Sequence, residues 1–203
     1  MKHGLNAVAA GVLLSVASLA LASAELNKPA PAFTALGADG KPVALSAYKG
    51  KTVVLEWTNH ECPFVVKHYE SGNIPTLQKD AASKGVVWLQ VVSSGPGKQG
   101  YVDGATAQKV NGYRHATPAN TVLDPDGKIG KLYGAQTTPH IFIVNADGQL
   151  VYKGGIDSIA STDHADLPKA ENYVVSALKA ISAGKPVEKA STKPYGCSVK
   201  YAS

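Results

Sequence analysis

Two cysteines, Cys62 and Cys197, are the residues of this sequence best suited to covalent chemistry, and the 203-residue chain contains no others. Cys62 is followed directly by Pro63, and it is preceded by a polar turn and by an apolar run that begins at Val53. This order predicts a strand, a turn and a helix, with proline at an early helical position where its missing N–H costs nothing. The thiol would then lie in the partial positive field of a helix N-terminus, which favours the nucleophilic thiolate.

The N-terminal segment has the features of a secretory signal peptide. Lys2 gives a basic start, residues 7–21 form an apolar run that is short for a membrane span, and Ala22-Ser23-Ala24 fits a cleavage site. We therefore predict a signal peptide over residues 1–24 and a periplasmic or secreted chain with no stable membrane insertion after cleavage. An uncleaved N-terminal anchor is the alternative. Because disulfides persist outside the cytoplasm, the two cysteines most simply form a pair.

The charge distribution bears on the class of partner. The chain has 20 Lys and Arg against 15 Asp and Glu, the lysines are scattered, and Arg114 is the only arginine. A nucleic-acid binder is expected to gather basic residues on one face or in one run, so we predict no nucleic-acid partner. The length after the signal peptide suits one domain over residues 25–186, followed by a tail over residues 187–203 that carries Cys197.

The remaining elements follow from hydrophobic spacing and from turn residues. Strands are predicted at 32–35 and 42–45, as a hairpin around the turn 38–41, and at 53–57, 86–92, 120–123, 141–144 and 150–153. A helix is predicted to begin at Cys62, to be interrupted at 71–73 and to resume as far as Gly85; further helices are predicted at 105–114, 128–133 and 168–181. His68, on the first of these helices, is predicted to lie at the surface.

Four motifs in order resemble the redoxin branch of the thioredoxin-fold proteins, which includes proteins similar to alkyl hydroperoxide reductase and thiol-specific antioxidant. The motifs are the segment from Leu55 to Tyr69, Asp124-Pro125-Asp126-Gly127, Thr137-Thr138-Pro139-His140 and the ending from Tyr195 to Tyr201. The resemblance implies an α/β, thioredoxin-like fold. It would have a central mixed sheet flanked by helices, an N-terminal β-hairpin extension, a C-terminal tail and no cofactor.

The resemblance also shows where this chain departs from thioredoxins. Thioredoxins carry a second cysteine three residues after the first, and here that position is Val65. Cys62 therefore needs a distant partner, an external thiol or no partner. Cys197 is the only internal candidate, and a mobile tail could carry it to Cys62.

Further site residues are implied by position within the family motifs. Glu56 matches a buried acid that relays protons in thioredoxins; a buried carboxyl has a raised pKa unless it is paired, and the alternative is that Glu56 faces solvent or pairs with a lysine. Asn59 stands where related peroxidases have threonine, and its amide can still donate a hydrogen bond. Thr138 and Pro139 match the loop in which a cis proline presents backbone groups to an extended substrate.

These residues predict a thiol oxidoreductase. Cys62 would attack a peroxide or a disulfide, Cys197 would resolve the intermediate, and an external thiol or disulfide protein would reset the pair. One alternative is a non-catalytic binding module whose tail is held by a structural Cys62–Cys197 disulfide. Another is a copper-handling protein that binds the metal through Cys62 and Cys197 with His140, or through His60, Cys62 and His140.

Overall fold

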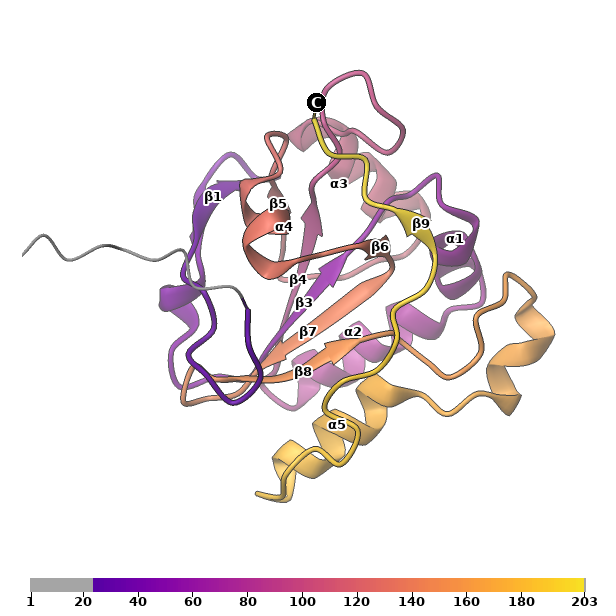
Figure 1. Cartoon of the computed structure of the whole chain (residues 1–203). Coiled ribbons are helices and arrows are strands. Elements are labelled where there is room, and N and C mark those ends of the chain that lie inside the picture. The colour runs from indigo at the N-terminus through magenta and orange to yellow at the C-terminus, as the bar shows by residue number, and fades with distance from the viewer. Residues whose placement is uncertain (1–23, 203) are drawn as a thin grey trace, which may run out of the picture.

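The computed structural model describes residues 24–202, and the prediction of a signal peptide falls almost wholly outside them. Seven strands form the central sheet in the order β2-β1-β5-β4-β3-β7-β8 (Figure 1). β3 pairs in parallel with β4 and antiparallel with β7, so the sheet is mixed, as predicted. The strands are β1 Thr34–Gly37, β2 Pro42–Ala44, β3 Val53–Trp57, β4 Val87–Val92, β5 Asn120–Leu123, β7 His140–Val144 and β8 Leu150–Gly154.

The alternation of side chains along the strands gives the sheet two buried faces. On β3, Leu55 and Trp57 point into one cluster with Phe142 of β7, and we call this side the Trp57 face. Val54 points to the opposite side, where the buried cluster includes Cys62, and we call that side the Cys62 face. Because both faces are covered, β3 is fully buried along its length, which explains its nearly continuous apolar sequence.

Helices cover both faces. The Cys62 face is covered by α1 Pro63–Glu70, α2 Asn73–Ser83, α3 Gly104–Tyr113 and α5 Tyr173–Ser182. The Trp57 face is covered by α4 Lys128–Tyr133, the 3₁₀ helix η1 Leu45–Tyr48 and the segment that leads into β1. Within residues 24–202, no helix is long and apolar enough to cross a membrane.

Most predicted elements are present, with shifted ends. The N-terminal hairpin is confirmed, with β1 and β2 in antiparallel register, although β1 begins at Thr34 rather than at residue 32. The prediction of one helix over 168–181 is wrong at its start, since residues 164–169 form the 3₁₀ helix η2 His164–Lys169. The helix α5 begins only after Asn172, whose side chain accepts a hydrogen bond from the Val175 N–H and so caps the helix there.

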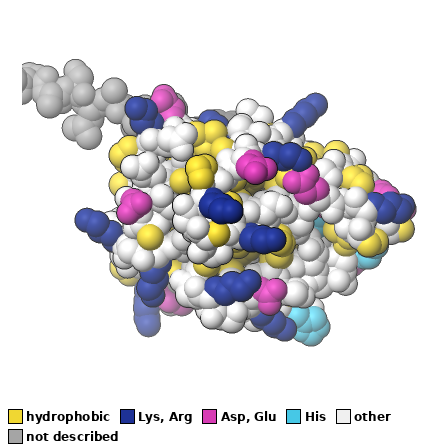
Figure 2. Space-filling model, turned by 90° about the horizontal axis from the view of Figure 1, so that it is seen from below, with side chains coloured by type: hydrophobic (Ala, Val, Ile, Leu, Met, Phe, Trp, Pro, Cys, Tyr) yellow, Lys and Arg dark blue, Asp and Glu magenta, His cyan; other side chains and the backbone are white. Residues whose placement is uncertain are grey.

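The C-terminal tail packs against the body of the molecule. It leaves α5 at the lower edge of Figure 1 and crosses the molecule to the opposite edge, where the chain ends. On the way, β9 Cys197–Ser198 pairs antiparallel with β6 Thr137–Thr138. Figure 2, which views the molecule from below, shows lysines interspersed with acidic side chains rather than gathered in one basic patch on that face.

Candidate active site

Cys62 and Cys197 form a disulfide, which joins the beginning of α1 to the tail and confirms the predicted pair. Cys62 is the N-cap residue of α1, with an extended backbone, and Pro63 occupies the first helical turn as expected. No part of Cys62 is exposed to solvent, whereas Cys197 is only half-buried. The tail therefore lies over Cys62 and shields its sulfur.

The Thr138–Pro139 loop lies against the same sulfur. The Thr138–Pro139 peptide bond is cis, and the carbonyl oxygen of Thr138 lies 3.1 Å from the Cys62 Sγ. Thr138 is paired directly with Cys197 across the two short strands, and the Cys197 N–H points at the Cys62 Sγ from 3.4 Å. In the dithiol state this N–H and the helix N-terminus would both stabilise a Cys62 thiolate.

Gly196 allows the tail to approach this closely. Its φ is +126°, and a Cβ at this position would run into the carbonyl group of Thr138 and the nitrogen of Pro139. A side chain at residue 196 would therefore push the tail away from the loop and from Cys62.

Two tyrosines anchor the tail on either side of Cys197. The Tyr195 hydroxyl donates to the Asp157 carboxylate and lies 3.1 Å from the His68 Nε2. The Tyr201 hydroxyl donates to the carbonyl of Ala135 at 2.7 Å. The tail is thus held by side chains of the body as well as by the disulfide.

The prediction that His68 lies at the surface is wrong. His68 is fully buried, and burial lowers its pKa to about 3. The Asn73 amide donates to Nδ1 at 2.8 Å, which leaves the proton of the neutral ring on Nε2, where it is donated to the Tyr195 oxygen. Helix α1 is covered by the sheet on one side and by the tail on another, so its polar residues Lys67 and His68 are enclosed, whereas Glu70 at its end is exposed.

Glu56 is fully buried on the Cys62 face, so the alternative in which it faces solvent is wrong. Its carboxylate accepts hydrogen bonds from the Tyr69 hydroxyl at 2.7 and 3.0 Å and from the Trp88 Nε1 at 2.7 Å. Burial raises the pKa of Glu56, and the positive charge of Arg114 acts in the opposite direction. Among the hydrogen bonds of residues 24–202, none joins Glu56 directly to Cys62.

A chain of hydrogen bonds runs from Glu56 to Arg114. Tyr69 accepts a bond from Gln90 at 2.7 Å, and Gln90 accepts one from Thr121 at 2.8 Å. Asn111 donates to Thr121 at 2.9 Å and accepts from the Arg114 guanidinium at 3.1 Å. The guanidinium also lies over the Tyr69 ring, 3.8 Å from its centroid.

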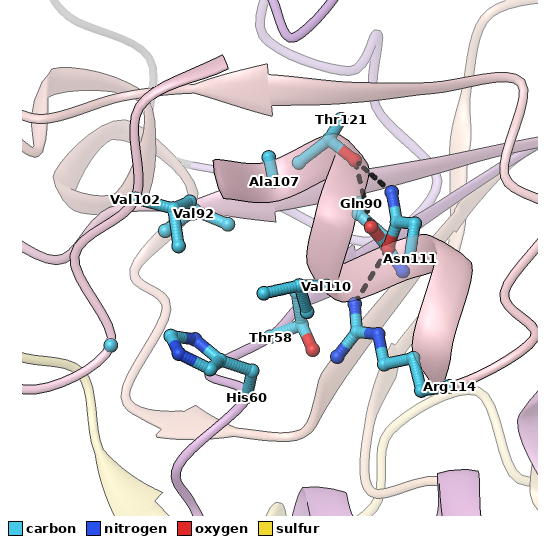
Figure 3. Close-up of a pocket in the computed structure, with 11 residues that line it drawn as sticks. Thr58, His60, Gln90, Val92, Val102, Ala107, Val110, Asn111, Arg114 and Thr121 are labelled. Atoms are coloured by element: carbon cyan, nitrogen blue, oxygen red, sulfur yellow. Dashed lines mark hydrogen bonds between the residues drawn. The ribbon is translucent and has the colours of Figure 1, made fainter. Parts of the chain in front are cut away.

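The far end of this chain borders a small cavity, which Figure 3 shows. Asn111 reaches it from α3 and Arg114 from the C-terminal end of that helix. Gln90 and Thr121 reach it from the sheet, and Thr58 and His60 from the turn before Cys62. Burial lowers the pKa of His60. No sequence pattern indicates that Arg114 approaches this turn, because the contact depends on how α3 packs on the sheet.

The side chain of Asn59 fixes the turn before Cys62. Its Oδ1 accepts the Glu61 N–H at 2.9 Å, and its Nδ2 lies 3.5 Å from the Gln99 carbonyl. Its own carbonyl accepts the Cys62 N–H at 3.1 Å, which positions the helix start. The amide therefore contacts the neighbouring loop, and a role of Asn59 in catalysis stays a prediction.

The proposed copper ligands are not assembled in this state. Among residues 24–202, no three His, Cys, Asp or Glu side chains are grouped so as to hold a metal ion. The Cys62 sulfur is bonded to Cys197, and the His140 Nδ1 accepts the Gln136 N–H at 3.2 Å. His140 is buried, which lowers its pKa to about 4.

Comparison with known proteins agrees with this geometry. Residues 25–173 match the Redoxin family. The chain belongs to this family. The matched region contains Cys62 and the Thr138–Pro139 loop but ends before the tail, so Cys197 lies outside it. No curated protein matches the sequence.

Solved structures show that the fold is thioredoxin-like. An uncharacterized conserved protein from Geobacillus kaustophilus superposes with a TM-score of 0.73 at 26% identity, over 88% of this chain and 93% of that one. A hypothetical protein from Sinorhizobium meliloti gives 0.68 at 23% identity, over 89% and 97%. The thioredoxin domain of a thiol-disulfide oxidoreductase from Bacteroides vulgatus gives 0.52 at 23% identity, over 72% and 98%.

Proposed function

We propose that this redoxin is a thiol oxidoreductase in which Cys62 and Cys197 cycle between a dithiol and a disulfide. The observation that carries the proposal is the position of the disulfide. Its Cys62 sulfur lies at a helix N-terminus, beside the Thr138 carbonyl and within reach of the Cys197 N–H. The helix N-terminus and the Cys197 N–H would favour the thiolate of Cys62, whereas the Thr138 carbonyl could only accept a hydrogen bond from the thiol. A stabilised thiolate makes Cys62 both the better nucleophile at neutral pH and the better leaving group.

The cycle balances as two exchanges. In the dithiol state the Cys62 thiolate attacks one sulfur of a partner disulfide, forms a mixed disulfide and releases the other partner sulfur as a thiolate. The Cys197 thiolate then attacks the Cys62 sulfur and releases the remaining partner thiolate, so that the partner is reduced and the Cys62–Cys197 bond forms. An external thiol protein reduces that bond and completes the cycle.

A disulfide is favoured over a peroxide as the oxidant. Asn59 occupies the position of the threonine found in related peroxidases, but its amide is held by Glu61 and Gln99. With a peroxide, Cys62 would instead become a sulfenic acid, which Cys197 would condense to the same disulfide with loss of water. Either route gives the protein a reductive role in the periplasm or outside the cell, where the N-terminal segment is proposed to direct it.

Glu56 is proposed to hold a proton near the site. Burial raises the pKa of Glu56, so its carboxyl binds and releases a proton at a higher pH than an exposed glutamate does. The link from Glu56 to the outer part of the site runs through Tyr69 and Gln90.

The proposal is tested by turnover with a protein disulfide and, separately, with hydrogen peroxide. Cys62→Ser should abolish turnover, whereas Cys197→Ser should allow the first exchange and accumulate a mixed disulfide on Cys62. Ser198→Ala is the matched control, since Ser198 is exposed and adjacent to Cys197, and it should react like the wild type. Equal turnover by Cys62→Ser and wild type with both oxidants would overturn the proposal and leave a structural bridge as the explanation.

A further inference from the structure

The position of the tail restricts how any partner can reach Cys62. Cys62 is completely buried while the tail is in place, so a partner sulfur can meet the Cys62 Sγ only after the tail has moved away. The partner cysteine must then occupy the place that Cys197 occupies in the disulfide. The residues that contact the tail therefore become the residues that contact the partner.

The backbone part of this surface accepts an extended strand. Thr137 and Thr138 pair with Ser198 and Cys197, and the Val199 N–H donates to the Gln136 carbonyl at 3.0 Å. Further along, the Gly95 N–H donates to the Lys200 carbonyl at 2.8 Å. These bonds set the register of a strand but do not distinguish one side chain from another.

The position directly before the cysteine, residue 196 in the tail, restricts which residue type can be present. The carbonyl of Thr138 lies where the Cβ of residue 196 would be, so only glycine fits without a shift of the backbone. This obstacle is made by the body of the protein and remains when the tail leaves. A partner strand in the same register meets the same restriction.

The position two residues before the cysteine meets a buried polar socket, formed by His68, Lys67 and Asp157 with Phe64 at its edge. The Tyr195 hydroxyl bonds with His68 and Asp157, and the ring lies edge-on to Phe64 with a centroid distance of 5.8 Å. The Lys67 Nζ lies 5.7 Å from the centroid of the Tyr195 ring.

The socket is unusual because its charges are incompletely satisfied. Within the described residues, the buried Lys67 Nζ and the Asp157 Oδ2 have no hydrogen-bond partner. Lys67, His68 and Asp157 are each at least 97% buried, and a folded protein seldom encloses such groups without a use. A phenol meets part of this need, because its hydroxyl bonds with Asp157 Oδ1 and with the imidazole and the centroid of its ring lies 5.7 Å from the ammonium.

We propose that the partner protein presents a Tyr-Gly-Cys segment to Cys62, with the partner tyrosine in the socket of His68, Lys67 and Asp157. This inference rests on the proposed thiol exchange and adds the partner sequence that the groove beside Cys62 recognises. The tail carries the same three residues and competes for the same groove. The partner tyrosine leaves the socket before Tyr195 returns to it. Cys197 then attacks the Cys62 sulfur, which breaks the mixed disulfide and releases the partner cysteine as a thiolate.

The test uses the complete chain with Gly196→Val and Cys197→Ser, which keeps Cys62 and removes the fit of the tail. The probe is a peptide with the sequence of residues 193–199, whose cysteine is joined by a disulfide to thionitrobenzoate. Attack of Cys62 on the peptide sulfur releases thionitrobenzoate, whose absorbance gives the rate. The comparison peptides carry Tyr195→Phe or Gly196→Ala, and glutathione measures the intrinsic reactivity of each peptide disulfide.

The parent peptide should react at least about 10-fold faster than the Tyr195→Phe peptide, because loss of a hydrogen bond to a buried charged group is worth about that much. The Gly196→Ala peptide should be slowed to a similar extent, and all three should react equally with glutathione. Equal rates for the three peptides with the protein would overturn this inference while Cys62 is shown to be reactive. Failure of Cys62 to react with any peptide or with Ellman's reagent would instead overturn the proposed function.

Discussion

The two faces of the central sheet are built from the same strands but differ in how their polar groups are satisfied. On the Trp57 face, the indole N–H donates to Ser93 at 3.0 Å, and the Asp124 carboxylate accepts the N–H groups of Ile129 and Gly130 at 3.1 and 2.9 Å. These bonds fix the start of α4. The polar groups of this face serve the fold, and among residues 24–202 no buried side-chain nitrogen or oxygen on it lacks a hydrogen-bond partner.

The Cys62 face keeps its polar groups less completely paired. Among residues 24–202, every buried side-chain nitrogen or oxygen without a hydrogen-bond partner belongs to Thr58, Lys67, Arg114 or Asp157. Thr58 and Arg114 line the cavity of Figure 3, and Lys67 and Asp157 surround Tyr195. Unpaired buried groups lower stability, and their concentration on the Cys62 face supports the proposed function, which places the reactive cysteine on this face.

The largest loss of stability is expected from a substitution in the core of the Trp57 face. Leu55→Ala should lower the free energy of unfolding by about 2–5 kcal/mol, because Leu55 is completely buried in a closely packed cluster. Urea unfolding measures the loss. The reactivity of Cys62 in the folded, reduced variant should stay at the wild-type level. A large fall in that reactivity would contradict the claim that the Trp57 face contributes to stability and not to the reactivity of Cys62.

On the Cys62 face, Gly196→Val should mainly affect the disulfide. The added side chain meets the Thr138 carbonyl, so the tail should dock poorly and the equilibrium with glutathione should move at least about 10-fold toward the dithiol, a shift of about 1.4 kcal/mol. Gly184→Val is the control, since Gly184 also has a positive φ but an open environment. The same shift in both variants would assign the effect to backbone strain and not to the site.

The two tyrosine anchors should differ in strength. Tyr195→Phe removes a hydrogen bond to a carboxylate, for which about 1.5–3 kcal/mol is expected, whereas Tyr201→Phe removes a bond to one carbonyl, for which about 0.5–1.5 kcal/mol is expected. The glutathione equilibrium of each variant reports how firmly the tail holds Cys197 beside Cys62. A larger effect from Tyr201→Phe would show that the socket around Tyr195 does not dominate tail docking.

The smallest expected effect is a gain in stability in the Glu56→Gln variant. Burial raises the folded-state pKa of Glu56 above its unfolded value, so the folded state binds more protons and stability falls as pH rises from the unfolded pKa through the folded pKa. The glutamine variant cannot lose this proton. It should therefore be more stable than wild type above that window and should show a flatter pH dependence of unfolding. A variant that loses stability with pH as steeply as wild type would mean that another group causes the slope.

Local signals were sufficient for much of the fold and for the reactive cysteine. The apolar runs of β3 and β7 and the Cys62-Pro63 start of α1 each occur within a few neighbouring residues. The pairing of Cys62 with Cys197 followed from there being only two cysteines. Such features are recorded in short stretches of sequence and are independent of how distant segments pack.

The socket could not be predicted in the same way. His68 resembles a surface residue of a short helix, but its ring contacts Tyr195, 127 residues away, and Asp157, which lie far from it in the sequence. Asp157 and Lys67 are recognised as parts of one socket only from their contacts with Tyr195 of the tail. Arg114 reaches the network of Glu56 because α3 packs on the Cys62 face. These contacts depend on tertiary packing, for which a single sequence gives no signal.

The most direct test of the account is the reduction potential of the Cys62–Cys197 bond in the mature protein, with the bond identified by mass spectrometry. A catalytic pair should titrate near or above about −250 mV, within the range of known redox-active disulfides. A bond that stays oxidised below about −300 mV would be structural, would contradict the thiol cycle and would leave a binding module with a fixed tail.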